Sequence, residues 1–172
     1  MSDPRSNLSL SNPWHLLATG FGSGLSPIVP GTMGTLASVP FYLMLAQLPL
    51  TLYAVVVVFA SLIGIKICQV TSDDMQVHDH GSIVWDEFAG FWITMLIVPL
   101  YQLPVFDWKW LVTGFVLFRF FDMLKPWPIS WLDKRVHGGF GIMIDDLVAG
   151  VMAAISLAAI GYWLEWLPAV PA

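Results

Sequence analysis

The chain has 172 residues, of which 57% are hydrophobic and 11% are charged, and its formal net charge is −5. Soluble domains are typically about 45–50% apolar and about 25% charged, so this composition excludes an ordinary soluble protein. The negative net charge argues against nucleic-acid binding, and the single cysteine, Cys68, excludes an internal disulfide and a thiolate metal cluster. Residues 1–172 contain no linker or low-complexity tract, so we expect one domain.

The first motif, residues 20–35, is rich in glycine, proline and hydroxyl side chains and carries no charge. Glycine lets backbone N–H groups turn toward an anion, and hydroxyl groups can add hydrogen-bond donors. Membrane helices also use glycine for close packing, which is the alternative explanation. The hydroxyl groups favour a phosphate-binding loop with Ser23, Ser26 and Thr32 as donors, whereas the missing Gly-Lys-Ser/Thr sequence excludes a P-loop.

Five apolar stretches follow, and their continuous hydrophobic runs are too long for ordinary strands. We expect helices, although some stretches are shorter than the roughly 20 residues that a membrane span needs. The sequence therefore predicts an all-α integral membrane bundle with about four to five apolar helices. The stretches are residues 36–48, 50–68, 88–103, 110–121 and 147–167.

Three long polar segments, residues 20–35, 69–87 and 122–146, alternate with two short turns that contain proline. Because successive membrane spans reverse direction, this alternation predicts that the three polar segments share one face of the membrane. The third segment is the most basic of these connections, and basic loops favour the cytoplasmic side. We therefore expect a multi-pass protein with its functional site on the cytoplasmic face.

Most of the carboxylates lie in two windows of the chain. Each window contains three apolar residues, an acidic pair, and then an apolar stretch with an early glycine, at residues 83–90 and 142–150. This pattern predicts that each acidic pair lies at the start of a helix, on the polar face. The acids of the two windows are Asp73, Asp74, Asp79, Asp86, Glu87, Asp122, Asp133, Asp145 and Asp146.

Two physical explanations compete for the acidic pairs. A carboxylate at a helix N-terminus is stabilised by about 0.3–1 kcal/mol, which explains one acid per helix but not two adjacent ones. Four acids at a membrane boundary repel one another unless cations bridge them, and ligands that offer only oxygen suit Mg²⁺ or Mn²⁺ rather than zinc. The metal ligands predicted in this way are Asp79, Asp86, Glu87, Asp122, Asp145 and Asp146.

Residues 119–128 place charges within an otherwise apolar region. Arg119 and Asp122 are three residues apart on an expected helix and could form a simple ion pair. The functional alternative assigns Arg119 and Lys125 to a substrate phosphate, and Asp122 to the metal or to the arginine. Pro126 and Pro128 should end the helix directly after Lys125.

Histidines flank one of the predicted metal ligands, because His78 and His80 lie on either side of Asp79. A histidine at this position could exchange a proton with an attacking water or a leaving alkoxide, and we favour His80 for this role. Simple solvation in a loop is the alternative. His15 and His137 have no neighbouring acidic cluster and are expected to be structural.

Taken in order, several of these motifs resemble the signature blocks of the phosphatidylglycerophosphatase A family. The resemblance implies an all-helical fold and Mg²⁺-dependent hydrolysis of phosphatidylglycerophosphate to phosphatidylglycerol and inorganic phosphate, on the cytoplasmic side of the inner membrane. The blocks are Gly-Ser-Gly-Leu-Ser-Pro at 22–27, Pro-Gly-Thr at 30–32, His-Asp-His-Gly-Ser-Ile-Val-Trp-Asp-Glu-Phe at 78–88, Phe-Arg at 118–119, Lys-Pro-Trp-Pro-Ile at 125–129, Gly-Ile-Met at 141–143 and Asp-Asp at 145–146.

The charge pattern and the resemblance together predict a metal-activated water at a carboxylate cluster, with catalytic roles for Asp86, Glu87, Asp145 and His80. An ion transporter with carboxylates along its pathway is the alternative. Transport predicts acids near the middle of spans, whereas here they gather at one boundary. The Asp-x-Asp-x-Thr/Val, Ser-Gly-His and Asp-x₂-Asp-Gly-x₂-Ala-Arg motifs of other lipid-phosphate enzymes do not occur.

Overall fold

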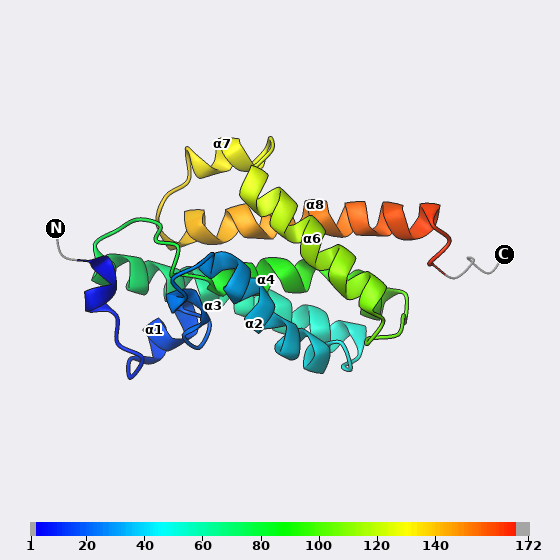
Figure 1. The fold of residues 1–172 in the computed structure, drawn as a ribbon, viewed down its shortest axis with the longest axis horizontal. Helices are drawn as coiled ribbons and strands as arrows, with labels where there is room; N and C mark the ends of the chain where they lie inside the picture. The colour runs from blue at the N-terminus through cyan, green and yellow to red at the C-terminus, as the bar shows by residue number, and fades with distance from the viewer. Residues whose placement is uncertain (1–2, 168–172) are drawn as a thin grey trace.

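The structure, a computed structural model, describes residues 3–167, and these residues form helices joined by turns, with no strand among them (Figure 1). The all-helical prediction is confirmed for this part of the chain. The elements are η1 (Pro4–Asn7), α1 (Pro13–Ala18), η2 (Ser23–Leu25), α2 (Pro30–Leu45), α3 (Leu50–Met75), α4 (Trp85–Thr94), α5 (Ile97–Leu100), α6 (Trp108–Leu124), α7 (Ile129–Asp133) and α8 (Gly138–Trp163).

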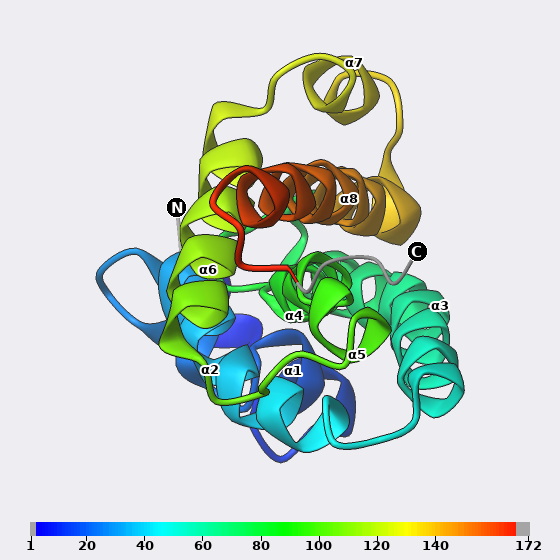
Figure 2. The same ribbon diagram turned by 90° about the vertical axis from the view of Figure 1, so that its right-hand side faces the viewer.

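Helix α4 lies in the middle of the bundle. It packs against α2, α3, α6 and α8, and the view along the bundle shows it enclosed by these helices (Figure 2). Nine of its ten residues are buried, so each side of this helix faces protein. Ten residues extend only about 15 Å, which is too short to cross a bilayer core of about 30 Å.

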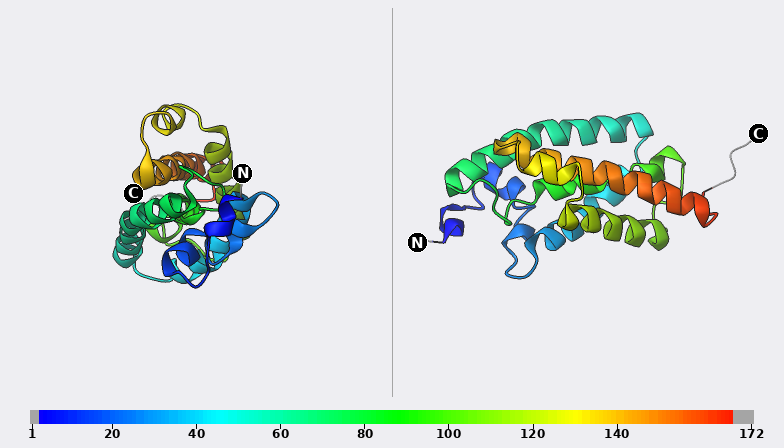
Figure 3. Two further views of the ribbon diagram at one scale, coloured as in Figure 1. Left: turned by 90° about the vertical axis from the view of Figure 1, so that its left-hand side faces the viewer. Right: turned by 90° about the horizontal axis from the view of Figure 1, so that it is seen from above.

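Helices α3 and α8 have 26 residues each and run along the length of the molecule (Figure 3). Both are long and apolar enough to cross a membrane. Only 33% of the most apolar window of α3 and 44% of that of α8 is buried, whereas the core helix of a soluble protein is mostly buried. Exposed apolar side chains such as Phe59, at 64%, and Ile155, at 66%, favour lipid as the surrounding solvent.

Prolines set several helix boundaries. Helix α6 ends at Leu124, one residue earlier than predicted, because Lys125 is its C-cap in a left-handed conformation directly before Pro126. The apolar stretch 88–103, expected as one helix, is divided into α4 and α5. In a continuous helix the ring of Pro99 would clash with the carbonyl group of Met95, where α4 has already ended. Pro30 begins α2, so the second half of the glycine-rich motif is helical rather than a loop.

The prediction that the second acidic pair lies at the start of its helix is wrong. Helix α8 begins at Gly138, seven residues before Asp145, whereas Asp86 and Glu87 do lie in the first turn of α4. The glycines at the start of α8 pack closely against α3: a Cβ atom on Gly139 would collide with the carbonyl oxygen of Ile65. This contact supports the additional helical turns before the acids.

The glycines that follow the two acidic pairs pack against each other where α4 crosses α8. A Cβ atom on Gly150 would collide with the carbonyl oxygen of Gly90, and one on Gly90 would lie 2.6 Å from the carbonyl oxygen of Asp146. Thr94 Oγ1 donates a hydrogen bond to Gly90 O at 3.0 Å and also lies 3.3 Å from Gly150 O. This close approach of the two backbones brings the acidic pair of each helix next to the other.

Candidate active site

The acidic pairs of α4 and α8 meet inside the bundle. Asp86, Glu87 and Asp146 each offer a carboxylate oxygen, and these oxygens all lie within 4.8 Å of one another. The three residues are 8%, 8% and 4% exposed. Two acidic motifs about 60 residues apart in sequence therefore form one cluster, as the charge argument predicts.

The carboxylate oxygens in this cluster are poorly satisfied by the protein itself. Asp86 Oδ1, Glu87 Oε2, Asp145 Oδ1 and Asp146 Oδ2 are buried and have no hydrogen-bond partner among the described residues. Unpaired buried polar atoms are rare in folded proteins, because each costs about 1–3 kcal/mol. The donor set contains only oxygen, so these residues fit a hard divalent cation such as Mg²⁺ or Mn²⁺.

Burial also disfavours the charged form of the α4 acids. It raises the pKa of Glu87 to about 8, and the nearby carboxylate of Asp146 adds to this effect. Burial raises the pKa of Asp86 well above its usual range, and Glu87 is the next cause. A bound cation would reverse this balance by stabilising the carboxylates.

Arg119 of α6 connects three helices at the edge of the cluster. Its guanidinium forms an ion pair with Asp122, lies 3.6 Å from Glu87 Oε1, and donates a hydrogen bond from Nη1 to Thr35 Oγ1 at 3.4 Å. The ion pair with Asp122 is therefore present, but Arg119 also contacts the acidic cluster. A Cβ atom on Gly31 would collide with Glu87 Oε1, so a larger residue where α2 approaches would displace this carboxylate.

Lys125 joins α7 to α8. Its ammonium group lies 2.6 Å from Asp133 Oδ1 and 3.0 Å from Asp145 Oδ2. Burial lowers the pKa of Lys125, but the hydrogen bonds to Asp133 and Asp145 outweigh it and raise the pKa above its usual range. The same hydrogen bond lowers the pKa of Asp133. Lys125 is therefore a fixed positive charge beside the cluster.

A pocket of about 200 Å³ opens onto these groups. It includes all six predicted metal ligands and Lys125, whereas Arg119 reaches it through its contacts with Glu87 and Asp122. We call this cavity the acidic pocket. Its lining residues are Asp79, Gly81, Ile83, Asp86, Glu87, Asp122, Lys125, Ile142, Asp145 and Asp146.

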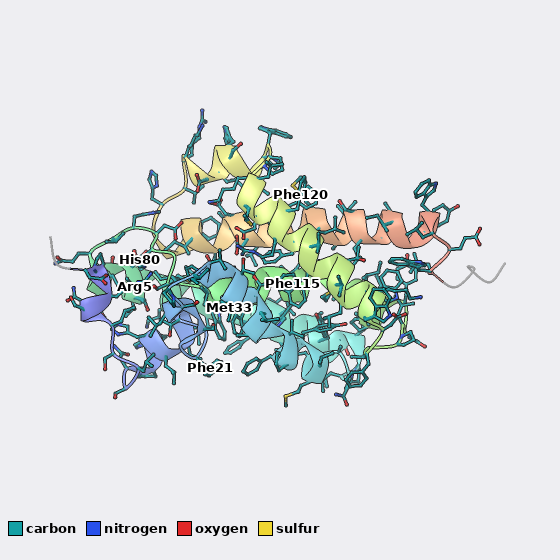
Figure 4. The ribbon with its side chains drawn as sticks, viewed as in Figure 1. Arg5, Phe21, Met33, His80, Phe115 and Phe120 are labelled. Atoms are coloured by element: carbon teal, nitrogen blue, oxygen red, sulfur yellow. The ribbon has the colours of Figure 1, made fainter. Side chains whose placement is uncertain are left out.

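Five of the predicted site residues do not line the acidic pocket: Arg119, which touches it only through Glu87 and Asp122, and Ser23, Ser26, Thr32 and His80. The hydroxyl of Ser23 donates to Gly20 O at 2.8 Å and that of Ser26 donates to Ile28 O at 2.9 Å, so both are used within their own loop. Thr32 is half-buried in the first turn of α2. His80, on the loop between α3 and α4, accepts a hydrogen bond at Nδ1 from Ser82 N at 3.1 Å (Figure 4).

His15 and His78 have defined hydrogen-bond partners. His15 is buried and contacts Asp74 Oδ2 at 2.9 Å, in keeping with its expected structural role. His78 Nε2 accepts a hydrogen bond from Gly138 N at 2.8 Å and so fixes the α3–α4 loop to the start of α8. This contact joins residues 60 positions apart, and no local sequence signal could have revealed it.

Sequence reasoning also missed residues that support the site. Gly31 and Thr35 contact Arg119, and Asp133 holds Lys125. Gly90 and Gly150 lie three and four residues after their acidic pairs, and this early glycine in both windows is the sequence signal for the helix crossing.

Comparisons with known proteins agree with this arrangement. A family model described as phosphatidylglycerophosphatase A matches residues 16–161. Phosphatidylglycerophosphatase A from Escherichia coli (strain K12) is 60% identical over 158 residues, which cover 92% of this chain and 89% of the relative. The protein of the same name from Haemophilus influenzae is 46% identical over 95% of this chain and 98% of its own length.

A more distant relative from Bacteroides thetaiotaomicron, provisionally described as a phosphatidylinositol-3-phosphatase, is 37% identical over 87% of this chain and 93% of its own length. No solved structure matches the chain. The family match covers most of the chain, including every acid of the cluster, and the relatives are similar over nearly their full lengths. The chain belongs to the phosphatidylglycerophosphatase A family.

Proposed function

We propose that this protein is a phosphatidylglycerophosphatase, which hydrolyses the terminal phosphate monoester of phosphatidylglycerophosphate to give phosphatidylglycerol and inorganic phosphate. The names of the relatives from Escherichia coli and Haemophilus influenzae and the family match support this activity. The observation that carries the proposal is the convergence of Asp86, Glu87 and Asp146 with unpaired oxygens inside one polar pocket.

We propose Mg²⁺ as the cofactor, held by Asp86, Glu87 and Asp146. Asp79, Asp122 and Asp145 line the same pocket and complete the proposed ligand set. When bound, Mg²⁺ would supply Lewis-acid polarisation of the phosphoryl oxygens and would lower the pKa of a coordinated water.

Positive side chains would bind the remaining phosphate oxygens. The Lys125 ammonium is held at the pocket by Asp133 and Asp145, so it is oriented before substrate arrives. The Arg119 guanidinium is held by Asp122 next to Glu87. Both charges would stabilise negative charge on the phosphoryl group during transfer. Phosphate binding by Ser23, Ser26 and Thr32 remains a prediction that needs the glycine-rich segment to release its internal hydrogen bonds.

The leaving glycerol oxygen needs a proton when its bond to phosphorus breaks, and His80 is our proposed donor. Because its Nδ1 accepts the Ser82 N–H, Nε2 is the ring nitrogen free to exchange a proton with the substrate. Donation requires the imidazolium form of His80, in which Nδ1 is also protonated and gives up the hydrogen bond from Ser82. His80 lies outside the lining of the acidic pocket, so this role requires the α3–α4 loop to move toward the substrate.

We further propose a multi-pass protein of the inner membrane that forms one domain over residues 1–172. Helices α3 and α8 would cross the bilayer, and the shorter apolar helices would complete a bundle of four to five. Below Asp146, residues 147–163 of α8 extend for about 25 Å, close to the bilayer core of about 30 Å. The acids would then lie at the cytoplasmic boundary, where a lipid headgroup can reach them while its acyl chains stay in the bilayer.

Phosphate release from purified protein tests the activity. Phosphatidylglycerophosphate and phosphatidic acid are each presented in mixed micelles, with Mg²⁺ or with a chelator. We expect Mg²⁺-dependent release from phosphatidylglycerophosphate and little from phosphatidic acid. Release that persists in chelator would reject the metal, and no release from either lipid would reject the activity. Ion flux in liposomes without phosphatase activity would instead favour a transporter.

A further inference from the structure

A second polar pocket of about 210 Å³ lies beside the acidic pocket. The two pockets share Asp79, Ile142 and Asp145, so they adjoin, and a ligand with its phosphate in the acidic pocket can extend into the second one. We call this cavity the histidine pocket. Its lining residues are His78, Asp79, Asp133, Val136, His137, Gly141, Ile142 and Asp145.

The two histidines supply hydrogen-bond donors that the acidic cluster lacks. Because His78 Nε2 accepts the Gly138 N–H, the proton of a neutral His78 is on Nδ1. The His137 ring meets His78 edge to face, with ring centroids 5.2 Å apart. His137 is the residue directly before α8, and its side chain is exposed, so its ring is accessible to a ligand.

Carboxylates supply acceptors in the same pocket. Asp133 Oδ1 is held by the Lys125 ammonium, which fixes the position of this side chain. Asp145 uses Oδ2 for Lys125, but its Oδ1 has no partner among the described residues although the side chain is only 8% exposed. The histidine pocket therefore presents histidine donors next to the carboxylate of Asp133, while Asp145 is shared with the proposed metal ligand set.

A hydroxyl group matches this combination, because it donates one hydrogen bond and accepts others. In phosphatidylglycerophosphate a glycerol unit connects the two phosphates. This glycerol carries a free hydroxyl group on the carbon next to the one that bears the phosphate to be removed. We propose that the histidine pocket binds this hydroxyl-bearing glycerol, and that His137 determines specificity for it. This inference rests on the proposed function, which places the terminal phosphate in the acidic pocket.

Competition experiments test hydroxyl recognition directly. Glycerol 3-phosphate and n-propyl phosphate share a phosphate and a three-carbon chain, but only the first carries hydroxyl groups. Both are used as inhibitors of phosphatidylglycerophosphate hydrolysis by wild-type protein, His137→Ala and His137→Gln. Hydrogen bonds of this kind contribute about two- to tenfold to binding, so wild type should bind glycerol 3-phosphate about fivefold more tightly than n-propyl phosphate.

We expect His137→Ala to abolish this preference, raise KM for the lipid and leave kcat within about threefold, because the variant loses one hydrogen bond to the substrate. His137→Gln, which can still donate and accept, should restore part of the preference. Equal inhibition by the two compounds in wild type, inhibition by neither, or an unchanged preference in His137→Ala would overturn the inference. Wild-type protein that does not hydrolyse the lipid would instead reject the proposed function.

Discussion

Helices α4 and α8 carry the same local motif in different surroundings. The α4 acids lie in the first helical turn of a short, enclosed helix, whereas the α8 acids lie seven and eight residues after the start of a helix long enough to cross a membrane. Capping of the helix N-terminus can therefore stabilise Asp86 or Glu87 but not Asp145 or Asp146. What the two pairs share is the helix crossing at Gly90 and Gly150, which brings their carboxylates together. The unpaired oxygens of this cluster fit a bridging cation.

The largest expected effect comes from removing one acid on either helix. Glu87→Gln and Asp146→Asn should each lower kcat/KM for phosphatidylglycerophosphate by at least about 100-fold, because each removes a negative charge from the predicted metal site. Glu165→Gln, the same chemical change at an exposed glutamate, is the matched control. A large loss for the α4 variant with normal turnover for the α8 variant would show that the helices do not share one site.

Separating the two helices should have the next largest effect. Gly150→Leu places a side chain against the carbonyl group of Gly90, so the helices must move apart and the acids with them. We expect a loss of about 10- to 100-fold in kcat and about 1–3 kcal/mol in stability, measured by turnover and thermal unfolding. Ala159→Leu, on an exposed position of α8, is the control and should be close to wild type in both measurements.

A substitution at Lys125 should distinguish a role in substrate binding from a role in metal binding. Lys125→Met removes the fixed charge at the pocket, and we expect KM to rise about tenfold while divalent-cation affinity falls less than in Glu87→Gln. Steady-state kinetics and metal titration of the same preparation measure both quantities. A loss of metal affinity equal to that of Glu87→Gln would assign Lys125 to the support of the acids rather than to the phosphate.

The smallest catalytic effect is expected on the exposed apolar face of α3. Phe59→Ser removes an exposed apolar side chain, so turnover in detergent should change less than about twofold. Phe59→Lys should in addition lower the fraction of protein recovered in membranes, because a charge in the bilayer core costs about 2.5–3.5 kcal/mol. Unchanged membrane recovery for the lysine variant would place this face outside the bilayer.

Local patterns in the sequence were sufficient for part of the structure. The apolar runs predict the helices, Pro126 marks the end of α6, and the clustering of acids predicts the residues of the acidic pocket. The helices and the end of α6 depend on neighbours along the chain, whereas the acidic pocket joins separate windows that their shared charge identifies. The division at Pro99 was also visible in principle, because a proline interrupts the hydrogen bonding of its own helix.

Contacts between distant residues were not predictable in this way. The position of Lys125 between Asp133 and Asp145 depends on how α7 folds back on α8, and the start of α8 depends on the packing of Gly139 against α3. The hydroxyl groups of Ser23 and Ser26 have the composition of an anion site, yet the structure directs both to backbone carbonyl groups of their own loop. Composition identifies available donors, but only the fold shows which remain free.

Titration of purified protein with a divalent cation tests the central claim most directly. Binding of Mn²⁺, followed by electron paramagnetic resonance or calorimetry, is compared in wild type, Glu87→Gln, Asp146→Asn and Glu165→Gln. Saturable binding in wild type and in Glu165→Gln is expected, with at least about tenfold weaker binding in each of the other two variants because α4 and α8 supply ligands to the same ion. Affinity unchanged by Asp146→Asn, or no saturable binding in wild type, would contradict a metal site shared by the two helices.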